Sequence, residues 1–297
     1  MIKIKIQAGL GNQMFQYALA RHLRERKKEV ILDSSFYSMG GVKGKDTLRE
    51  YELDKFNIDE NFKKDFSSTA YRATLFEKLF RRIKNESAFV FYRKYLNPKE
   101  NACLIGFWQS EKYFKDIESI IRKEFTLKDK IEERGDTDES KKYLEKIKNS
   151  KNSISINVRR GDYANNQKTR NYHGLLTTDY FLEGIKYIIK EKEYQKEGVD
   201  IFVFSDDVDW CMENLNSFKD FGKIIFVPKE ISATDTLYLI SKCQNNIIAN
   251  SSFSWWGAWL NENKDKIIIA PKNWTRKRIN AKDVCPEDWI RLENRFY

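Results

Sequence analysis

The sequence of 297 residues predicts an α/β protein with two domains, each built around a parallel sheet. Three observations carry this prediction. The chain is long enough for two cores, it opens with a strand, a glycine loop and a helix, and strands alternate with helices in its second half. We place an N-terminal domain at residues 1–150 and a C-terminal domain at residues 151–297, flanking a cleft. A linker or surface helix is expected near residues 128–152, where lysine and glutamate dominate.

The first domain begins with an alternating strand at residues 2–6, and a helix starts near Gln13. Between them lie Gly9, Gly11 and Asn12. Glycine lets a backbone come close to a ligand, and a helix N-terminus favours anions. This glycine loop, including Gln13, is therefore a candidate phosphate or substrate loop. The alternative is that the glycines serve packing alone, as they do in many βα turns.

Two further strands are expected in the first domain, one at residues 29–33 and one that begins the stretch 102–111, with a helix-rich polar middle between them. The second strand runs into a loop that holds Trp108 and Glu111. Residues 71–96 mix aromatic and apolar side chains with arginine and lysine. That mixture fits either an amphipathic basic helix lying on an anionic membrane or an ordinary helix packed on a core.

Strands and helices alternate in the second domain in the manner of βαβ units. Apolar runs typical of strands occupy residues 154–158, 201–204, 224–227, 247–249 and 267–270, and helical patterns occupy residues 179–192, 208–215, 234–241 and 253–260. Such units form a parallel sheet, whose ligands bind outside the carboxyl ends of the strands. Functional side chains are therefore expected directly after the strands.

Polar side chains that suit a nucleotide diphosphate follow three of these strands. They are Arg159, Arg160 and Asp162 after the first strand, Asp206 and Asp207 after the second, and Ser251, Ser252 and Ser254 after the fourth. Guanidinium groups match phosphate oxygens in a bidentate manner and stay charged, while serine hydroxyls at a helix N-terminus suit the same oxygens. Capping alone explains any single serine. A carboxylate would bind ribose hydroxyls or base N–H groups.

Six blocks of the sequence resemble those of family 11 glycosyltransferases, the bacterial α-1,2-fucosyltransferases and their relatives. The blocks are GLGNQMFQYA at residues 9–18, GFWQSEKYF at 106–114, VRRGDY at 158–163, YHG at 172–174, FSD at 204–206 and NSSFSWW at 250–256. They occur in the family's order and span nearly the whole chain. The resemblance implies a GT-B architecture, in which two Rossmann-like domains face a central cleft. It also implies GDP-fucose as the donor, an inverting mechanism and no metal or other cofactor.

The resemblance also implies roles for individual residues. Arg159 and Arg160 correspond to the basic pair that holds the donor diphosphate, and the run 251–254 to the block that contacts its β-phosphate. Asp235 lies where a wider group of fucosyltransferases has a carboxylate that binds the guanine base. The implied reaction moves L-fucose to the 2-hydroxyl of a galactoside in a surface glycan such as an O-antigen. Its partners would be GDP-fucose and a galactose-containing acceptor.

One position departs from the family pattern. The basic motif of the family usually begins with histidine, and this chain has Asn157. An amide can still donate and accept hydrogen bonds near the donor but cannot titrate, so we expect an effect on donor affinity rather than on reaction type. Asp162, Glu111 and His173 are candidates for the weak base that the acceptor hydroxyl needs, and Trp108 is a candidate acceptor contact. Asp162 could instead form a salt bridge that orients an arginine.

Two alternatives stay open at this point. The strand at 201–204, followed by Asp206, Asp207 and Asp209, also fits a metal-dependent GT-A transferase with carboxylate ligands for Mn²⁺. The formal net charge of +10 also fits a basic protein that binds nucleotides or nucleic acid without turnover. Because the strand-end side chains are organised for one small ligand and not for a long backbone, we expect no nucleic-acid partner.

Three further absences in the sequence bear on location. No apolar run reaches the length of about 18 residues that a membrane span needs, and the first residues lack the apolar core of a signal peptide. The four cysteines show no metal-binding or redox spacing. We therefore expect a cytoplasmic protein. A lipid-linked acceptor would bring it to the inner face of the bacterial inner membrane, where its positive charge would meet anionic lipid.

Overall fold

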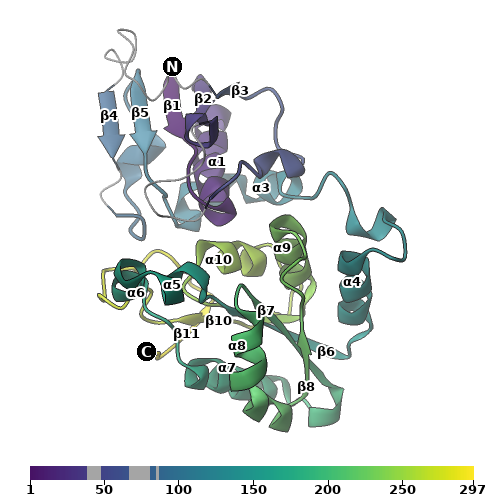
Figure 1. Ribbon diagram of the computed structural model, residues 1–297. Helices are drawn as coiled ribbons and strands as arrows, with labels where there is room; N and C mark the ends of the chain where they lie inside the picture. Colours follow the sequence, from purple (N-terminus) through teal and green to yellow (C-terminus); the bar gives the residue numbers. More distant parts are fainter. Residues whose placement is uncertain (39–47, 67–80, 85–86) are drawn as a thin grey trace. The chain divides into compact units, whose positions relative to one another are not determined.

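The computed structural model describes residues 1–38, 48–66, 81–84 and 87–297, which form two compact units (Figure 1). Unit 1 comprises Met1–Lys128 and Asn280–Pro286, and unit 2 comprises Asp129–Ile279 and Glu287–Tyr297. Each unit has its own parallel sheet, so the prediction of an α/β protein with two parallel sheets is confirmed. The boundary differs from the one expected at residue 150, because the helix of residues 139–149 packs on a helix of unit 2.

The sheet of unit 1 has the order β3-β2-β1-β5-β4, with every neighbouring pair parallel. Its strands are β1 (Ile2–Lys5), β2 (Val30–Asp33), β3 (Lys63–Asp65), β4 (Arg81–Lys84) and β5 (Ala102–Ile105). Helix α1 (Leu10–Glu25) follows β1, and two shorter helices are α2 (Ser35–Ser38) and α3 (Glu118–Glu124). Single 3₁₀ turns span Leu53–Lys55, Arg93–Leu96, Glu111–Tyr113 and Lys115–Ile117. The strand order reverses direction between β1 and β5, which is where open α/β sheets bind ligands.

The basic stretch at residues 71–96 is not one helix. Its residues 81–84 form strand β4, in parallel register with Ala102–Ile105 of β5, and 93–96 form a 3₁₀ turn. Pairing with a neighbouring strand has overridden the local pattern of alternating apolar and basic residues. Residues 71–80 and 85–86 lie outside the described part of the chain, and so does that part of the expectation.

The sheet of unit 2 has the order β11-β10-β9-β6-β7-β8, again with every neighbouring pair parallel. Its strands are β6 (Asn152–Val158), β7 (Val199–Ser205), β8 (Lys223–Phe226), β9 (Asn245–Ile247), β10 (Ile268–Pro271) and β11 (Ile290–Leu292). In chain order this is the 3-2-1-4-5-6 arrangement of the Rossmann fold, with the reversal between β6 and β9.

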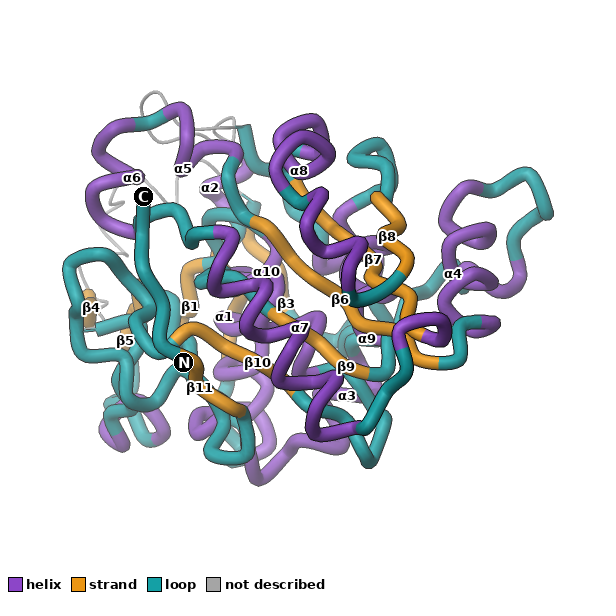
Figure 2. Tube along the Cα trace, turned by 90° about the horizontal axis from the view of Figure 1, so that it is seen from below, coloured by secondary structure: helices purple, strands orange, loops and turns teal. Residues whose placement is uncertain are grey.

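Helices cover both faces of the sheet in unit 2 (Figure 2). They are α4 (Glu139–Asn149), α5 (Gly161–Asn165), α6 (Gln167–His173), α7 (Thr178–Lys192), α8 (Val208–Asn214), α9 (Ala233–Lys242) and α10 (Ser252–Trp259). Further 3₁₀ turns span Ile131–Glu133, Lys196–Gly198 and Asn216–Asp220. None of the helices in the described ranges is long and apolar enough to cross a membrane.

Two glycines bring the helices of unit 2 close to their neighbours. A Cβ on Gly184 of α7 would lie 3.0 Å from Ile247 of β9, and one on Gly257 of α10 would lie 2.6 Å from Ile240 of α9. On the face that α9 covers, Asn246 donates hydrogen bonds to Ser155 of β6 at 2.7 Å and to the Ile240 carbonyl at 2.8 Å. The hydrogen bonds of Asn246 tie β9 to β6 and to the end of α9.

Candidate functional site

The carboxyl edge of unit 2 carries the arginines and serines that the sequence singled out. Ile156 of β6 lies opposite Ile247 of β9 in parallel register, so the segments that follow both strands reach the same edge. The Tyr163 hydroxyl, which follows β6, donates a hydrogen bond to the carbonyl of Asn250, which follows β9, at 3.4 Å. The two segments therefore lie together at the point where the strand order reverses, the place where such sheets bind ligands.

Arg160 is held on two sides at this edge. Its Nε donates to Asp207 Oδ2 at 3.0 Å, and its guanidinium carbon lies 3.8 Å from the centre of the Trp210 ring. Its terminal N–H groups donate to no residue in the described ranges, and 15% of the side chain is exposed. A guanidinium fixed by a carboxylate and an aromatic face loses little freedom when it binds an anion. The sequence analysis missed Trp210. The signal that could have found it is Asp207, which the analysis named and which caps the helix that carries Trp210.

Arg159 is oriented by a second carboxylate. Its Nη1 donates to Asp206 Oδ2 at 2.6 Å, and Asp206 Oδ1 accepts from the backbone N–H of Arg160 at 2.8 Å. A Cβ on Gly161 would lie 2.4 Å from Asp206 Oδ2, so only glycine leaves room for this carboxylate. Asp206 was expected to bind the donor, whereas here its two oxygens position the arginines. The side chain of Asp162 lies outside the described part of the structure.

The serine run after β9 is largely engaged in local bonds. Ser251 Oγ accepts from the backbone N–H of Phe253 at 3.3 Å and caps α10. Ser254 is fully buried, and its hydroxyl lies within hydrogen-bonding distance of the carbonyls of Ala249 and Ser251. Ser252 is half-buried, and its hydroxyl bonds to no residue that the structure describes. Among the three serines, the hydroxyl of Ser252 thus neither donates nor accepts a hydrogen bond within the described ranges.

Two asparagines at this edge differ in what they bind. Asn157 is 6% exposed, and its amide forms no hydrogen bond with any described residue. Asn250, which the sequence analysis did not single out, donates to the carbonyls of His173 at 3.0 Å and Trp274 at 3.2 Å. It thereby joins the last residue of α6 to the segments that follow β9 and β10. The ring of His173 stacks on Tyr163, with centroids 4.6 Å apart and planes 9° apart.

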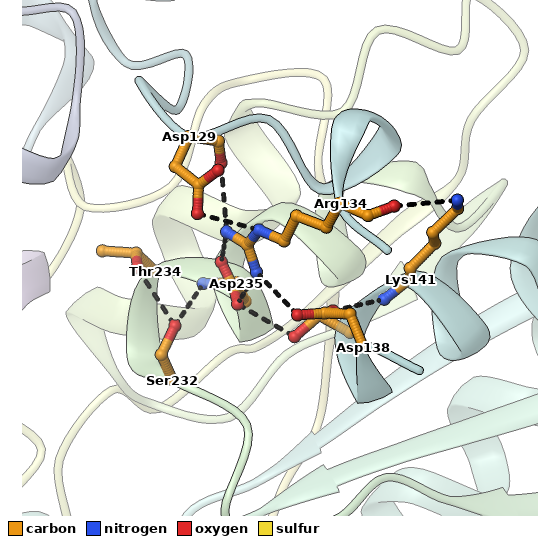
Figure 3. Close-up of polar contacts among 8 residues, drawn as sticks. Asp129, Arg134, Asp138, Lys141, Ser232, Thr234 and Asp235 are labelled. Atoms are coloured by element: carbon orange, nitrogen blue, oxygen red, sulfur yellow. Dashed lines mark hydrogen bonds and ion pairs between the residues drawn. The ribbon is translucent and has the colours of Figure 1, made fainter. Parts of the chain in front are cut away.

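Asp235 lies at the start of α9, where its carboxylate is fully engaged (Figure 3). Arg134 donates to both oxygens, at 2.6 and 2.9 Å, and Ser140 donates to one of them at 2.9 Å. Ser232 caps the helix by accepting from the backbone N–H of Asp235. The hydrogen bond that Arg134 donates to Asp235 raises the pKa of Arg134 above its ordinary value. The carboxylate expected to bind guanine therefore anchors the first segment of unit 2.

The carboxyl edge of unit 1 is built from buried amides. Gln16 Oε1 accepts from the backbone N–H of Gln7 after β1, and its Nε2 donates to the carbonyl of Gly106 after β5, both at 2.9 Å. Gln109 Nε2 donates to Asn12 Oδ1 at 2.6 Å. Gln16 thus joins the two strand ends that flank the reversal of strand order in this sheet. These amides shape the glycine loop.

The other candidate site residues of unit 1 are buried or bonded to neighbouring residues of the protein. Trp108 is fully buried, with a backbone φ of 42°, and its ring packs edge-on against Tyr95 at 5.9 Å. Glu111 forms an ion pair with Lys115 at 3.1 Å, and Gln13 is fully buried. A fully buried ring cannot stack on an acceptor sugar, so the expected contact through Trp108 does not fit its position.

Arg49 and Glu52 were missed by the sequence analysis, because they lie in a charged run that resembles an ordinary solvated surface. Burial raises the pKa of the Glu52 carboxyl above its ordinary value, and the Arg49 guanidinium opposes that shift in part. Arg49 also stands over the glycine loop: its Nη1 lies 3.7 Å from the position of a Cβ on Gly9. A desolvated carboxyl that interacts with a cation over the glycine loop is a candidate functional group.

The carboxylates named for a metal-dependent alternative face the arginines. Asp206 and Asp207 form ion pairs with Arg159 and Arg160. Within the described ranges, no group of three histidine, cysteine, aspartate or glutamate residues is arranged to hold a metal ion.

Comparison with known proteins identifies the family. The model of Glycosyl transferase family 11 matches residues 1–293. The chain is 36% identical over 308 residues to an alpha-1,2-colitosyltransferase of Escherichia coli, covering 99% of both chains. It is 33% identical to the O-antigen biosynthesis glycosyltransferase WbnK of Escherichia coli, covering 97% of this chain and 99% of the relative.

More distant likenesses include animal and bacterial fucosyltransferases. A galactoside alpha-(1,2)-fucosyltransferase 1 of Aotus azarae is 27% identical over 165 residues, which are 53% of this chain and 42% of that protein. The crystal structure of the fucosyltransferase NodZ from Bradyrhizobium superimposes with a TM-score of 0.48 at 13% identity, over 86% of this chain and 92% of that one.

Proposed function

The chain belongs to glycosyltransferase family 11, and from this premise we propose that it transfers fucose, or a deoxy form of fucose, from a GDP donor to the 2-hydroxyl of a galactoside. The names of the similar proteins support this, since they include α-1,2-transferases of colitose and of fucose. The O-antigen role of one relative supports a bacterial surface glycan as the acceptor.

The observation that carries the proposal is the braced arginine pair at the carboxyl edge of unit 2. Asp206 holds Arg159, and Asp207 together with Trp210 holds Arg160. In the proposed reaction the acceptor oxygen bonds to C1 of the sugar while the bond from C1 to the diphosphate oxygen breaks. Negative charge then grows on the diphosphate, and preset guanidinium groups stabilise it without reorganising. Attack from the face opposite the diphosphate inverts C1.

The remaining polar groups of this edge supply donor contacts. The hydroxyl of Ser252 lies at the N-terminus of α10, where backbone N–H groups favour phosphate. The nearly buried amide of Asn157 can donate to or accept from the nucleotide or the sugar. An amide does not titrate, so we assign it to binding. The acceptor proton leaves late in such a transfer and needs only water or a weak base.

The donor sugar is the finer part of the proposal. Colitose is fucose without its 3-hydroxyl group, and the relative that transfers it is 36% identical to this chain. Parallel assays with GDP-fucose and GDP-colitose on a galactoside acceptor distinguish the two sugars. Calorimetric titration with GDP and UDP, in EDTA and with Mn²⁺, tests the nucleotide and the metal. We expect metal-independent binding of GDP and none of UDP; absence of GDP binding would refute the donor assignment.

We further propose that unit 2 binds the donor and unit 1 the acceptor, in the cytoplasm at the inner face of a bacterial membrane. A lipid-linked acceptor would meet the protein there, and the net charge of +10 suits anionic lipid. Flotation of the protein with liposomes containing anionic lipid should show binding that salt weakens. Equal recovery with neutral and anionic liposomes would contradict the membrane contact.

A further inference from the structure

Aromatic rings gather where β1, β2 and β3 end in unit 1. Tyr37 follows β2, and its hydroxyl donates to the carbonyl of Ala8, which follows β1, at 2.9 Å. Tyr51 contacts Tyr37 edge-on at 5.7 Å and Phe66, which follows β3, at 5.3 Å. Phe66 is 42% exposed, and Leu48, a few residues before Tyr51 in the chain, is 61% exposed. These rings, the aromatic wall of Tyr37, Tyr51 and Phe66, border the carboxyl edge of the sheet.

A buried amide holds residues 49–52 beside this wall. Gln13, fully buried in α1, donates to the Glu50 carbonyl at 2.7 Å and accepts from the backbone N–H of Glu52 at 3.0 Å. The segment is therefore fixed to the glycine loop at two points. Arg49 consequently lies over Gly9, with its guanidinium 3.7–3.8 Å from the position of a Cβ.

The carboxylate of Glu52 is free of hydrogen bonds to the residues that the structure describes. It is half-buried, and it forms no ion pair with any described residue. Burial raises the pKa of this carboxyl, so holding it there in its ionised form lowers the stability of the fold. Arg49 and Tyr37 interact with it electrostatically. A desolvated carboxylate without a hydrogen-bond donor is suited to accept hydrogen bonds from a ligand.

We propose that Arg49 and Glu52, together with the aromatic wall, bind a neutral sugar ring of the acceptor. Sugar hydroxyls donate to a carboxylate and accept from a guanidinium, while the C–H face of a sugar packs on aromatic rings. Opposite charges side by side do not select an anion, so this edge is unsuited to a nucleotide diphosphate. The inference rests on the proposed function and names the acceptor residues within it.

The test compares Glu52→Gln with Glu50→Gln. Glu50 is an exposed neighbour whose backbone carbonyl, not its side chain, bonds to Gln13. We expect Glu52→Gln to raise the KM for a galactoside acceptor about tenfold or more, the scale of a lost hydrogen bond to a charged group. The affinity for GDP should stay unchanged, and so should the slow hydrolysis of the GDP-sugar donor that releases GDP when no acceptor is present. Glu50→Gln should match the parent protein in all three measurements.

A stability measurement excludes a merely structural role. Because the folded-state pKa of Glu52 is raised above 4.5, ionising it destabilises the fold at neutral pH and has no such cost below pH 4. Glu52→Gln should therefore raise the urea midpoint of the full chain at pH 7.5 and leave it unchanged at pH 4. A structural carboxylate would give a lower midpoint at pH 7.5, and that result would overturn the proposal.

Direct binding separates this inference from the donor assignment. Lactose is titrated into the full chain without any nucleotide, and binding that Glu52→Gln weakens supports the acceptor site whatever the donor is. If GDP does not bind but lactose does, the donor assignment fails and the sugar site stands. Lactose binding that is absent, or that both glutamine variants weaken equally, overturns the sugar site.

Discussion

The two carboxyl edges differ in what internal bonding leaves available for a ligand. In unit 2, Asp206 and Asp207 are engaged by the arginines, and the terminal N–H groups of Arg160 remain unbonded within the described structure. In unit 1, buried amides such as Gln16 are engaged by backbone groups, while the carboxylate of Glu52 and exposed aromatic surface remain. The first edge offers cationic donors and the second offers an anionic acceptor and apolar faces.

This difference shows why motif composition alone misassigns side chains. Each edge contains carboxylates and arginine, so a count of charges would make them equivalent. What distinguishes them is which groups already have a partner. A carboxylate that is bonded to an arginine acts through the arginine that it orients. A carboxylate without such a bond is held at a desolvation cost, which hydrogen bonds from a ligand can offset.

The largest expected effect comes from breaking the cationic edge at Arg160. Arg160→Ala should lower turnover about 10²–10³-fold, the cost of losing one preset donor to a developing anion. Arg160→Lys keeps the charge but loses the planar group that stacks on Trp210, so its rate should lie between the rates of the parent protein and of Arg160→Ala. Steady-state rates with saturating acceptor measure both. A near-parental rate for Arg160→Ala would remove the distinction between the edges.

A second prediction concerns the Arg134–Asp235 pair, which is expected to stabilise unit 2 without contacting the nucleotide. Arg134→Met leaves the Asp235 carboxylate, 9% exposed, with Ser140 as its remaining side-chain donor. We expect a loss of about 2–4 kcal/mol in the free energy of unfolding, somewhat below the cost of breaking a fully buried pair. Urea unfolding of the full chain measures this loss.

The matched control for that pair is Lys130→Met in the same segment. Lys130 pairs with Glu133 at 2.7 Å, but both side chains are more than 60% exposed, so the free energy of unfolding should stay that of the parent protein. Titration of Asp235→Asn with GDP and UDP then tests the base-binding role implied by family resemblance. We expect Asp235→Asn to bind GDP in preference to UDP as the parent protein does. Binding of UDP by this variant would mean that Asp235 contacts the base.

A third prediction tests whether the carboxylates of unit 2 act by positioning. In Gly161→Ala the new Cβ would lie 2.4 Å from Asp206 Oδ2, so the carboxylate must move away from Arg159. Because small misplacements of catalytic groups cost up to about 100-fold, we expect turnover to fall roughly 10- to 100-fold with the charges intact. Gly135→Ala, where no atom lies within 4 Å of the new Cβ, should change nothing.

Much of this organisation could be predicted from the sequence because local patterns determine it. The alternation of short apolar runs with helical patterns predicted the parallel sheet of unit 2, and strand ends pointed to Arg159 and Arg160. The resemblance to family 11 is confirmed by the match over residues 1–293. These features depend on residues that are neighbours in the chain.

The features that could not be predicted depend on residues far apart in the chain. The ion pair between Arg159 and Asp206 joins residues that are 47 positions apart, and Asn250 binds the His173 carbonyl 77 positions away. Ser254 was expected to contact phosphate, but its hydroxyl lies against the Ala249 carbonyl; that contact is local, and only the packing of α10 decides that this side chain is buried. The proposed role of Glu52 depends on its burial without a hydrogen bond to any residue of the described ranges, which no sequence pattern reveals.

The smallest expected effect concerns backbone strain at the edge of unit 1. Ala8 has a φ of 68°, a left-handed conformation that costs non-glycine residues roughly 1–2 kcal/mol. Its carbonyl accepts hydrogen bonds from Gln13 and Tyr37, which hold it there. Ala8→Gly should raise the free energy of unfolding by about 0.5–1 kcal/mol, because the larger freedom of glycine in the unfolded chain offsets part of the relief.

Lys27→Gly is the control, since Lys27 has a φ of 60° just after α1, at the opposite end of that helix from Ala8. Both variants should gain similar stability in urea unfolding. If the strain at Ala8 shapes the acceptor edge, a more mobile loop should raise the acceptor KM roughly twofold to threefold in Ala8→Gly only, with GDP affinity unchanged. Equal acceptor KM values in the two variants would mean that the aromatic wall and Glu52 keep their places without help from the strained loop.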